Sequence, residues 1–183
     1  NPFEAYTVLV RGALGSVSGL TQTLTKMTPL LLVGLGICIA FRGGMINIGA
    51  EGQIILGALT TTAVALALPD WPGWILLPLV LLCGAFAGAV WGGIAGVLTA
   101  RLGVNEILTT VMLNVIALQL MNFLLSGPML DPEQIAAGTN IPQSAKLPEQ
   151  VWLTRLVPRT LLHSGIILAI ILAVLVYLLL WRT

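Results

Sequence analysis

The stretch FRGGMINIGAEGQ, from Phe41 to Gln53, places glycines, an arginine, an asparagine and a glutamate between two apolar segments. Each glycine inside a helix costs about 1 kcal/mol of helix stability, so we expect the preceding helix to break at Gly43 and Gly44. Non-helical backbone at membrane depth is tolerated where it is buried in protein or lines a cavity, as it does in transporters. The stretch therefore predicts an interrupted helix beside an aqueous route.

The composition indicates the solvent of this chain. Of its 183 residues, 57% are hydrophobic and 8% are charged, and the mean hydropathy is +1.01. Such a surface faces hydrocarbon, so the chain is predicted to be an integral membrane protein. The net charge of +1 and the pI near 8.0 provide no basic field for nucleic acid.

Residues suited to catalysis or metal binding are scarce. Cys38 and Cys83 lie inside apolar runs, which favours small buried side chains without a disulfide. Two cysteines and one histidine form no zinc pattern, and no nucleophile, base and orienting group occur together. Lys26 and Lys146 are followed by methionine and leucine instead of the serine or threonine of a P-loop. Energy for any transport is therefore expected from a partner.

Apolar runs and turns divide the chain into four regions. Residues 1–28 are moderately polar and are expected at the membrane interface. Residues 29–125 are expected to form transmembrane helices with a broken segment at 42–53, and residues 126–163 a long extracytoplasmic loop. A last apolar helix is predicted at 164–181. The fold class is thus all-α, a polytopic transmembrane helix bundle with discontinuous helices, within one domain fragment over residues 1–183.

The predicted helix from Trp74 to Ala100 carries glycines at four successive i, i+4 positions. They are Gly84, Gly88, Gly92 and Gly96. Such a stripe lets another helix approach closely and offers no chemistry.

Two glutamates in the apolar region require an explanation. A charge at the bilayer centre costs about 2.5 to 3.5 kcal/mol, so Glu51 and Glu106 are expected at an interface, in a pair, or facing water. Glu51 either caps a helix N-terminus or faces the transport pathway, and Arg42 either pairs with it or anchors the interface. Glu106 is placed to complement a helix dipole or to face the pathway.

Neutral polar side chains complete the pathway candidates. At 100° per residue, Glu106, Thr110 and Asn114 share one face of the helix predicted from Ile107 to Leu125, so that face should look into the bundle. The amides suit sugar hydroxyls or a nucleoside, and hydrogen bonds between helices explain them equally well. The pathway candidates are Asn47, Glu51, Gln53, Asn105, Glu106, Thr110 and Asn114.

Basic residues in the short flanks predict the orientation. If the spans alternate, Arg42, Arg101 and Arg182 share one side, and the positive-inside rule makes that side cytoplasmic.

Two motifs carry a resemblance to a known family. The segments AFRGGMINIGAEGQIILGA and ARLGVNEILTTVMLN resemble permease subunits of bacterial ABC importers for nucleosides and simple sugars, which are related to ribose-type and branched-chain amino-acid permeases. The sequence GAEGQ in the first motif favours a nucleoside or a sugar over an amino acid as the substrate.

The resemblance implies discontinuous helices around a central path in the bacterial plasma (inner) membrane. It also implies a second permease subunit, identical or different, two cytoplasmic ATPase subunits that bind ATP, and an extracytoplasmic solute-binding protein. Such permeases have a helix before Asn1 and a coupling segment after Trp181, so we expect this chain to be an internal piece. The permease itself would carry no cofactor and no metal.

Two other classes remain open. An ion-coupled secondary transporter or channel would also use broken helices, but it would need acids or histidines near the bilayer midplane. A purely structural membrane subunit would not need the polar face on the helix from Ile107 to Leu125.

Overall fold

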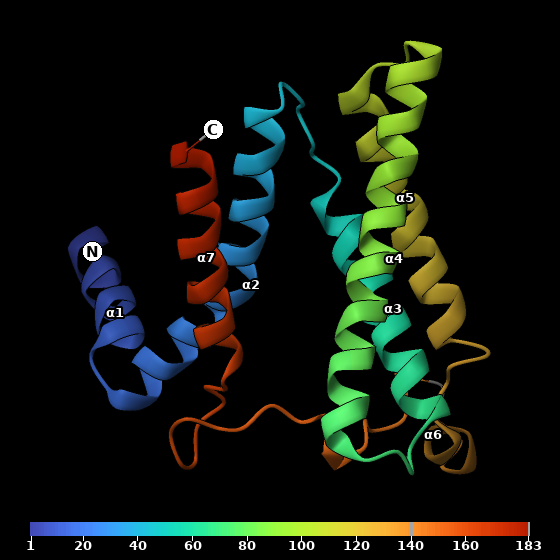
Figure 1. Cartoon of the computed structure of the whole chain (residues 1–183). Helices are drawn as coiled ribbons and strands as arrows, with labels where there is room; N and C mark the ends of the chain where they lie inside the picture. Colours follow the sequence, from blue (N-terminus) through green and yellow to red (C-terminus); the bar gives the residue numbers. More distant parts are fainter. Residues whose placement is uncertain (140, 183) are drawn as a thin grey trace. The chain divides into compact units, whose positions relative to one another are not determined.

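The computed structural model describes residues 1–139 and 141–182, and the regular elements within them are helices joined by non-helical segments, apart from one isolated bridge (Figure 1). The chain divides into two compact units. Unit 1 consists of Asn1–Gly43 and Leu153–Thr183, and unit 2 consists of Gly44–Trp152. Among the described residues, five helices are long and apolar enough to cross a membrane. They are α2 (Val17–Arg42), α3 (Ala50–Ala67), α4 (Gly73–Leu102), α5 (Glu106–Leu125) and α7 (Gly165–Arg182). The predicted all-helical, polytopic fold is confirmed.

Unit 2 is a bundle of α3, α4 and α5, in which each helix packs against the other two. Its buried centre lies near the end of α3 and the start of α4, where Ala65, Leu76 and Val80 pack with Val151. Val151 belongs to a short 3₁₀ helix, η1 (Glu149–Val151), so the chain after α5 returns to close this end of the bundle.

The glycines of α4 set its spacing from α3. A Cβ on Gly84 would overlap the hydroxyl of Thr61, which donates a hydrogen bond to the Val80 carbonyl at 3.2 Å. A Cβ on Gly88 would lie 3.1 Å from the Gln53 carbonyl. The helix backbones therefore approach closely, and a side chain at Gly84 or Gly88 would push α3 away.

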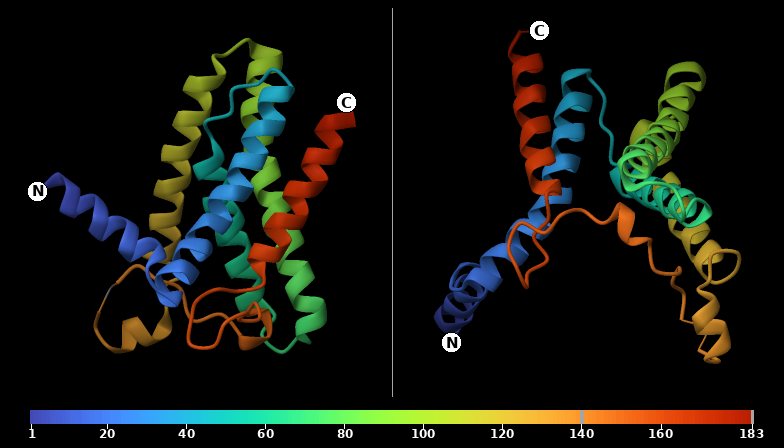
Figure 2. Two further views of the ribbon diagram at one scale, coloured as in Figure 1. Left: turned by 90° about the vertical axis from the view of Figure 1, so that its left-hand side faces the viewer. Right: turned by 60° about the horizontal axis from the view of Figure 1, so that its bottom comes forward.

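Unit 1 contains α1 (Pro2–Leu14), α2 and α7. The α2 and α7 helices pack side by side and run in the same direction, so that Arg42 and Arg182 end them at the same end of the unit (Figures 1 and 2). Most large apolar side chains of α7 are exposed within the chain, as expected for a surface that faces lipid or other protein.

The start of α2 differs from the sequence-based expectation. The predicted transmembrane region begins at residue 29, but α2 begins at Val17 and contains Pro29. Ser16 caps it by accepting a hydrogen bond from the Gly19 N–H at 3.0 Å. Proline lacks the N–H that would bond to the preceding turn, and α2 nevertheless continues through Pro29 to Arg42. The polar residues from 17 to 28 are thus part of the same helix as the apolar ones.

The segment expected as a loop, residues 126–163, contains short ordered elements. In unit 2, α6 (Pro132–Ala136) begins at the buried Asp131, whose carboxylate accepts the Glu133 N–H at 3.1 Å. In unit 1, Arg155 and His163 form an isolated antiparallel bridge before α7. The last helix begins at Gly165, one residue after the predicted start.

Candidate functional site

The candidate site is the junction that leads into α3, formed by residues 44–49 together with the starts of α3 and α5. The helical structure of α2 ends at Arg42, and Gly44 adopts φ +76°, a left-handed conformation that favours glycine. The chain remains non-helical until Ala50. The interruption therefore falls where the paired glycines predict it.

Asn114 of α5 holds the start of α3 with both ends of its side-chain amide. Its Oδ1 accepts the Gly52 N–H at 2.9 Å, and its Nδ2 donates to the Ile48 carbonyl at 3.0 Å. The first four N–H groups of a helix have no partner within it, and Gly49 at the N-cap has no side chain to supply one. Asn114 therefore performs the capping role from a neighbouring helix.

Glu106 and Asn105 organise the start of α5. Asn105 is the N-cap, and its Oδ1 accepts the Leu108 N–H at 3.2 Å. The Glu106 carboxylate lies in the first turn of α5, where it complements the helix dipole, and it accepts the Ile46 N–H of the junction at 3.2 Å. The start of α5 thus binds the junction as well as being capped.

Asn47 and Thr110 shape the junction from opposite sides. The Asn47 Oδ1 accepts the Gly49 N–H at 2.7 Å, which closes a local turn. Thr110 is buried against Gly49, and its hydroxyl donates to the carbonyls of Glu106 and Ile107 of its own helix. Gly49 is itself buried, and a Cβ there would lie 3.1 Å from the Thr110 Cβ.

The two remaining candidates lie on the first turn of α3 but play different parts. Glu51 is exposed and makes no capping hydrogen bond within the described part of unit 2, so the capping role anticipated for it belongs to Asn114. Gln53 is half-buried, and its amide occupies the space beside Gly92 on α4. The structure therefore brings Asn47, Glu106, Thr110 and Asn114 together around the junction and leaves Glu51 at its surface.

Trp91 is a neighbour of the site that the sequence did not assign to it. A Cβ on Gly52 would lie 2.8 Å from the Trp91 Nε1 and 3.0 Å from the Asn114 Oδ1. The indole N–H is buried without a hydrogen-bond partner in the described residues. No sequence signal pairs a mid-helix tryptophan with a glycine about 40 positions earlier.

The depth of the junction follows from helix length. The 18 residues of α3 cover about 27 Å, close to the roughly 30 Å of a bilayer core. Trp71 and Trp74, exposed beyond the far end of α3, suit the headgroup belt at one surface. The start of α3 then lies near the opposite boundary of the hydrocarbon, where an exposed glutamate is tolerated.

The chemistry available at the junction is hydrogen bonding by neutral amides and hydroxyls, with one carboxylate on each helix start. Among the described residues, no group of three His, Cys, Asp or Glu side chains is placed to hold a metal ion.

Candidate spans separated by a structured polar junction define a multi-pass membrane protein of the transporter type. Residues 19–183 match the family described as the branched-chain amino acid transport system permease component, and the chain belongs to this family. The resemblance to permease subunits seen in the sequence is confirmed.

Three relatives refine the comparison. The glucose ABC transporter permease protein TsgB13 of Haloferax volcanii is 38% identical over all of this chain and 49% of its own length. The guanosine ABC transporter permease protein NupP of Bacillus subtilis is 36% identical over 95% of this chain and 49% of its own length. The nucleoside ABC transporter permease protein NupB of Lactococcus lactis is 33% identical over all of this chain and 51% of its own length.

The chain thus spans about half the length of the curated relatives it matches. No solved structure matches it.

Proposed function

We propose that the chain forms part of the translocation path of an ABC importer for a nucleoside or a simple sugar in a bacterial plasma membrane. The family membership and the relatives named for glucose, guanosine and nucleosides support this assignment. Their shared substrate chemistry is a hydroxyl-rich sugar ring, which neutral amides and hydroxyls can hydrogen-bond.

The observation that carries the proposal is the amide of Asn114 clamped to the start of α3. Its two hydrogen bonds, to the Gly52 N–H and the Ile48 carbonyl, make the non-helical backbone of residues 44–49 a defined structure between two helices. With Arg101 on the cytoplasmic side, the junction would form the cytoplasmic end of the path, where substrate leaves. Weak, exchangeable contacts suit an exit, because a substrate that bound tightly there would stabilise the substrate-bound state and leave it slowly.

The partners follow from the class of transporter. A second permease subunit, identical or related, would complete the path, and two cytoplasmic ATPase subunits would bind and hydrolyse ATP. An extracytoplasmic binding protein would deliver substrate to the outer face, where the segment 126–163 offers exposed polar side chains such as Glu133 and Lys146.

Uptake by the full-length parent with its ATPase and binding protein tests this proposal. Proteoliposomes would be supplied with labelled guanosine or glucose, with ATP inside. We expect ATP-dependent uptake of one of them that is lost when the P-loop lysine of the ATPase is replaced. Uptake driven instead by a proton or sodium gradient would assign the chain to the ion-coupled transporters.

Two substitutions test the junction in the same assay. Glu51→Gln and Asn114→Ala should each slow uptake while the protein still inserts in the membrane. Unchanged uptake in both variants would remove the junction from the path.

A further inference from the structure

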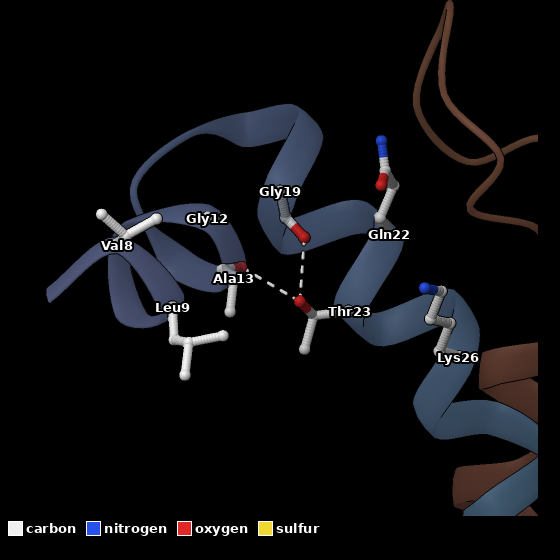
Figure 3. A pocket seen from close by; sticks show the side chains of 8 residues that line it. All are labelled: Val8, Leu9, Gly12, Ala13, Gly19, Gln22, Thr23 and Lys26. Carbon is white, nitrogen blue, oxygen red and sulfur yellow. Dashed lines mark hydrogen bonds between the residues drawn. The ribbon is translucent and has the colours of Figure 1, made fainter. Parts of the chain in front are cut away.

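A pocket lies in unit 1, at the corner between α1 and the first turns of α2. It has a volume of about 330 Å³ and is lined by Val8, Leu9, Gly12, Ala13, Gly19, Gln22, Thr23 and Lys26 (Figure 3). The Thr23 hydroxyl lies between the two helices and contacts the carbonyls of Ala13 and Gly19 at 3.0 and 2.9 Å. The Gly19 position has no room for a Cβ, because one would overlap the Gly12 carbonyl. The corner is therefore a close, hydrogen-bonded packing of two helices.

The lining of this pocket is amphipathic. Val8 and Leu9 of α1 are 68% and 66% exposed, and they provide an apolar wall. Lys26 and Gln22 of α2 are exposed and provide a cation and an amide. Among the described residues that line the pocket there is no acidic side chain.

The charge of unit 1 also favours an anion. Unit 1 contains six lysines and arginines and one acidic residue, Glu4, whereas unit 2 contains two basic and six acidic residues. The nearly neutral chain is thus a basic unit joined to an acidic one. Of these basic residues Lys26 is the one that lines the pocket, and a lysine near the membrane surface attracts anionic lipids by about 1 kcal/mol.

The place of Lys26 along α2 sets the depth of the pocket. Sixteen residues separate it from Arg42, which is about 24 Å of helix. If Arg42 marks one boundary of a roughly 30 Å hydrocarbon core, Lys26 lies just inside the other. A lysine at that depth extends its ammonium toward the headgroups.

We propose that this pocket, which we call the corner pocket, binds an anionic phospholipid. The lipid phosphate lies between the Lys26 ammonium and the Gln22 amide, and one acyl chain lies along Val8 and Leu9. Phosphate accepts hydrogen bonds from both groups, and the apolar wall continues into the hydrocarbon.

Native mass spectrometry of the purified chain in detergent tests the proposal. The protein would be titrated with dioleoyl phosphatidylglycerol or dioleoyl phosphatidylcholine, and bound lipids counted. We expect preferential binding of phosphatidylglycerol. Lys26→Gln should weaken it about fivefold, the usual effect of one lysine near an anionic surface. Arg11→Gln, which removes the same charge from α1 outside this pocket, should weaken it less than twofold.

A second variant tests the apolar wall without changing charge. A Cβ at Gly12 meets nothing within 4 Å, so Gly12→Leu adds an apolar side chain to the lining of the pocket. It should reduce the binding of phosphatidylglycerol while the melting temperature stays unchanged or rises.

Four outcomes would overturn the proposal. Equal losses in Lys26→Gln and Arg11→Gln would indicate general charge attraction. Equal binding of phosphatidylglycerol and phosphatidylcholine by the unsubstituted chain would show that the pocket has no preference for an anionic lipid. Displacement of the lipid by millimolar inorganic phosphate would identify a free-phosphate site, and the absence of any retained lipid would mean that another occupant covers the pocket.

Discussion

The side chain of Asn114 satisfies a donor and an acceptor that belong to the start of another helix. One end of its amide takes the Gly52 N–H, which no residue of α3 can accept, and the other end holds the Ile48 carbonyl before the helix begins. Isolated from water, either backbone group left alone would cost about 1–3 kcal/mol. The amide thereby fixes the position at which α3 starts.

Replacement of Asn114 by alanine should therefore destabilise the protein. We expect a loss of about 1–2 kcal/mol in the free energy of unfolding, because two inter-element hydrogen bonds disappear. Thermal unfolding in detergent, followed by circular dichroism, measures it. Asn122→Ala is the matched control, since Asn122 is exposed on the same helix. Equal melting temperatures for both variants would contradict the capping role.

Gly52 is required for a different reason, because three groups share the space beside it. A Cβ would lie 2.8 Å from the Trp91 Nε1 and 3.0 Å from the Asn114 Oδ1. Gly52→Ala should therefore destabilise the chain by roughly 1–3 kcal/mol through overpacking. Gly93→Ala on α4, whose Cβ meets nothing, should instead be neutral or stabilising by up to about 1 kcal/mol. A stabilised Gly52→Ala variant would show that the indole moves freely.

At the scale of the element, the interruption between α2 and α3 depends on two glycines with different backbone conformations. Gly43 has φ −76°, which any residue adopts, whereas Gly44 has φ +76°. Only the second needs glycine for conformational reasons. Alanine substitutions at Gly43 and Gly44 can therefore be compared to measure the backbone strain at Gly44.

The two glycines should respond differently to alanine. Gly44→Ala is expected to cost about 1–2 kcal/mol, the usual penalty for a left-handed alanine. Gly43→Ala should have little effect, because its Cβ would lie 3.4 Å from the Ala40 carbonyl, an ordinary contact. Melting temperatures of both variants test this, and equal effects would mean that φ at Gly44 is not restraining the junction.

The elements were predictable from the sequence to different degrees. Apolar runs and glycine pairs give the ends of α3, α4, α5 and α7 to within about four residues, because burial in lipid and helix propensity are local properties. The start of α2 was misplaced by 12 residues, because Pro29 suits a first turn and the serine cap lies earlier in a polar stretch.

The site was less predictable than the helices. The residue types at the junction were anticipated, but their partners were not, because Asn114 bonds backbone groups more than 60 positions away. Because Gly52 and Ile48 form these bonds through their backbone, their residue types do not indicate a partner. Only tertiary structure could distinguish Glu51 at the surface from Asn114 at the cap.

At the scale of the whole molecule, the chain combines a basic unit with an acidic one, and the paired glycines lie at the boundary between them. The basic side chains of unit 1 lie at both ends of its helices: Arg42 and Arg182 end α2 and α7, while Arg155 and Arg159 precede α7. Net charge alone therefore does not orient the chain. The positive-inside rule gives most weight to short flanks near the spans, which favours the ends at Arg42, Arg101 and Arg182 as cytoplasmic.

Cysteine labelling of the full-length parent in intact cells tests that orientation. After Cys38 and Cys83 are replaced by serine, a single cysteine is introduced as Val104→Cys, between α4 and α5, or as Glu133→Cys on α6. Both positions are exposed. A membrane-impermeant maleimide should label Glu133→Cys from outside, because α6 lies in the segment assigned to the outer face.

Val104→Cys should react only after permeabilisation, since it lies three residues from Arg101 on the cytoplasmic side. The reverse pattern would invert the orientation. It would then place the junction at the outer end of the path, where substrate enters instead of leaving. Labelling of both positions in intact cells would mean that α5 does not cross the membrane, which its 20 residues of about 30 Å argue against.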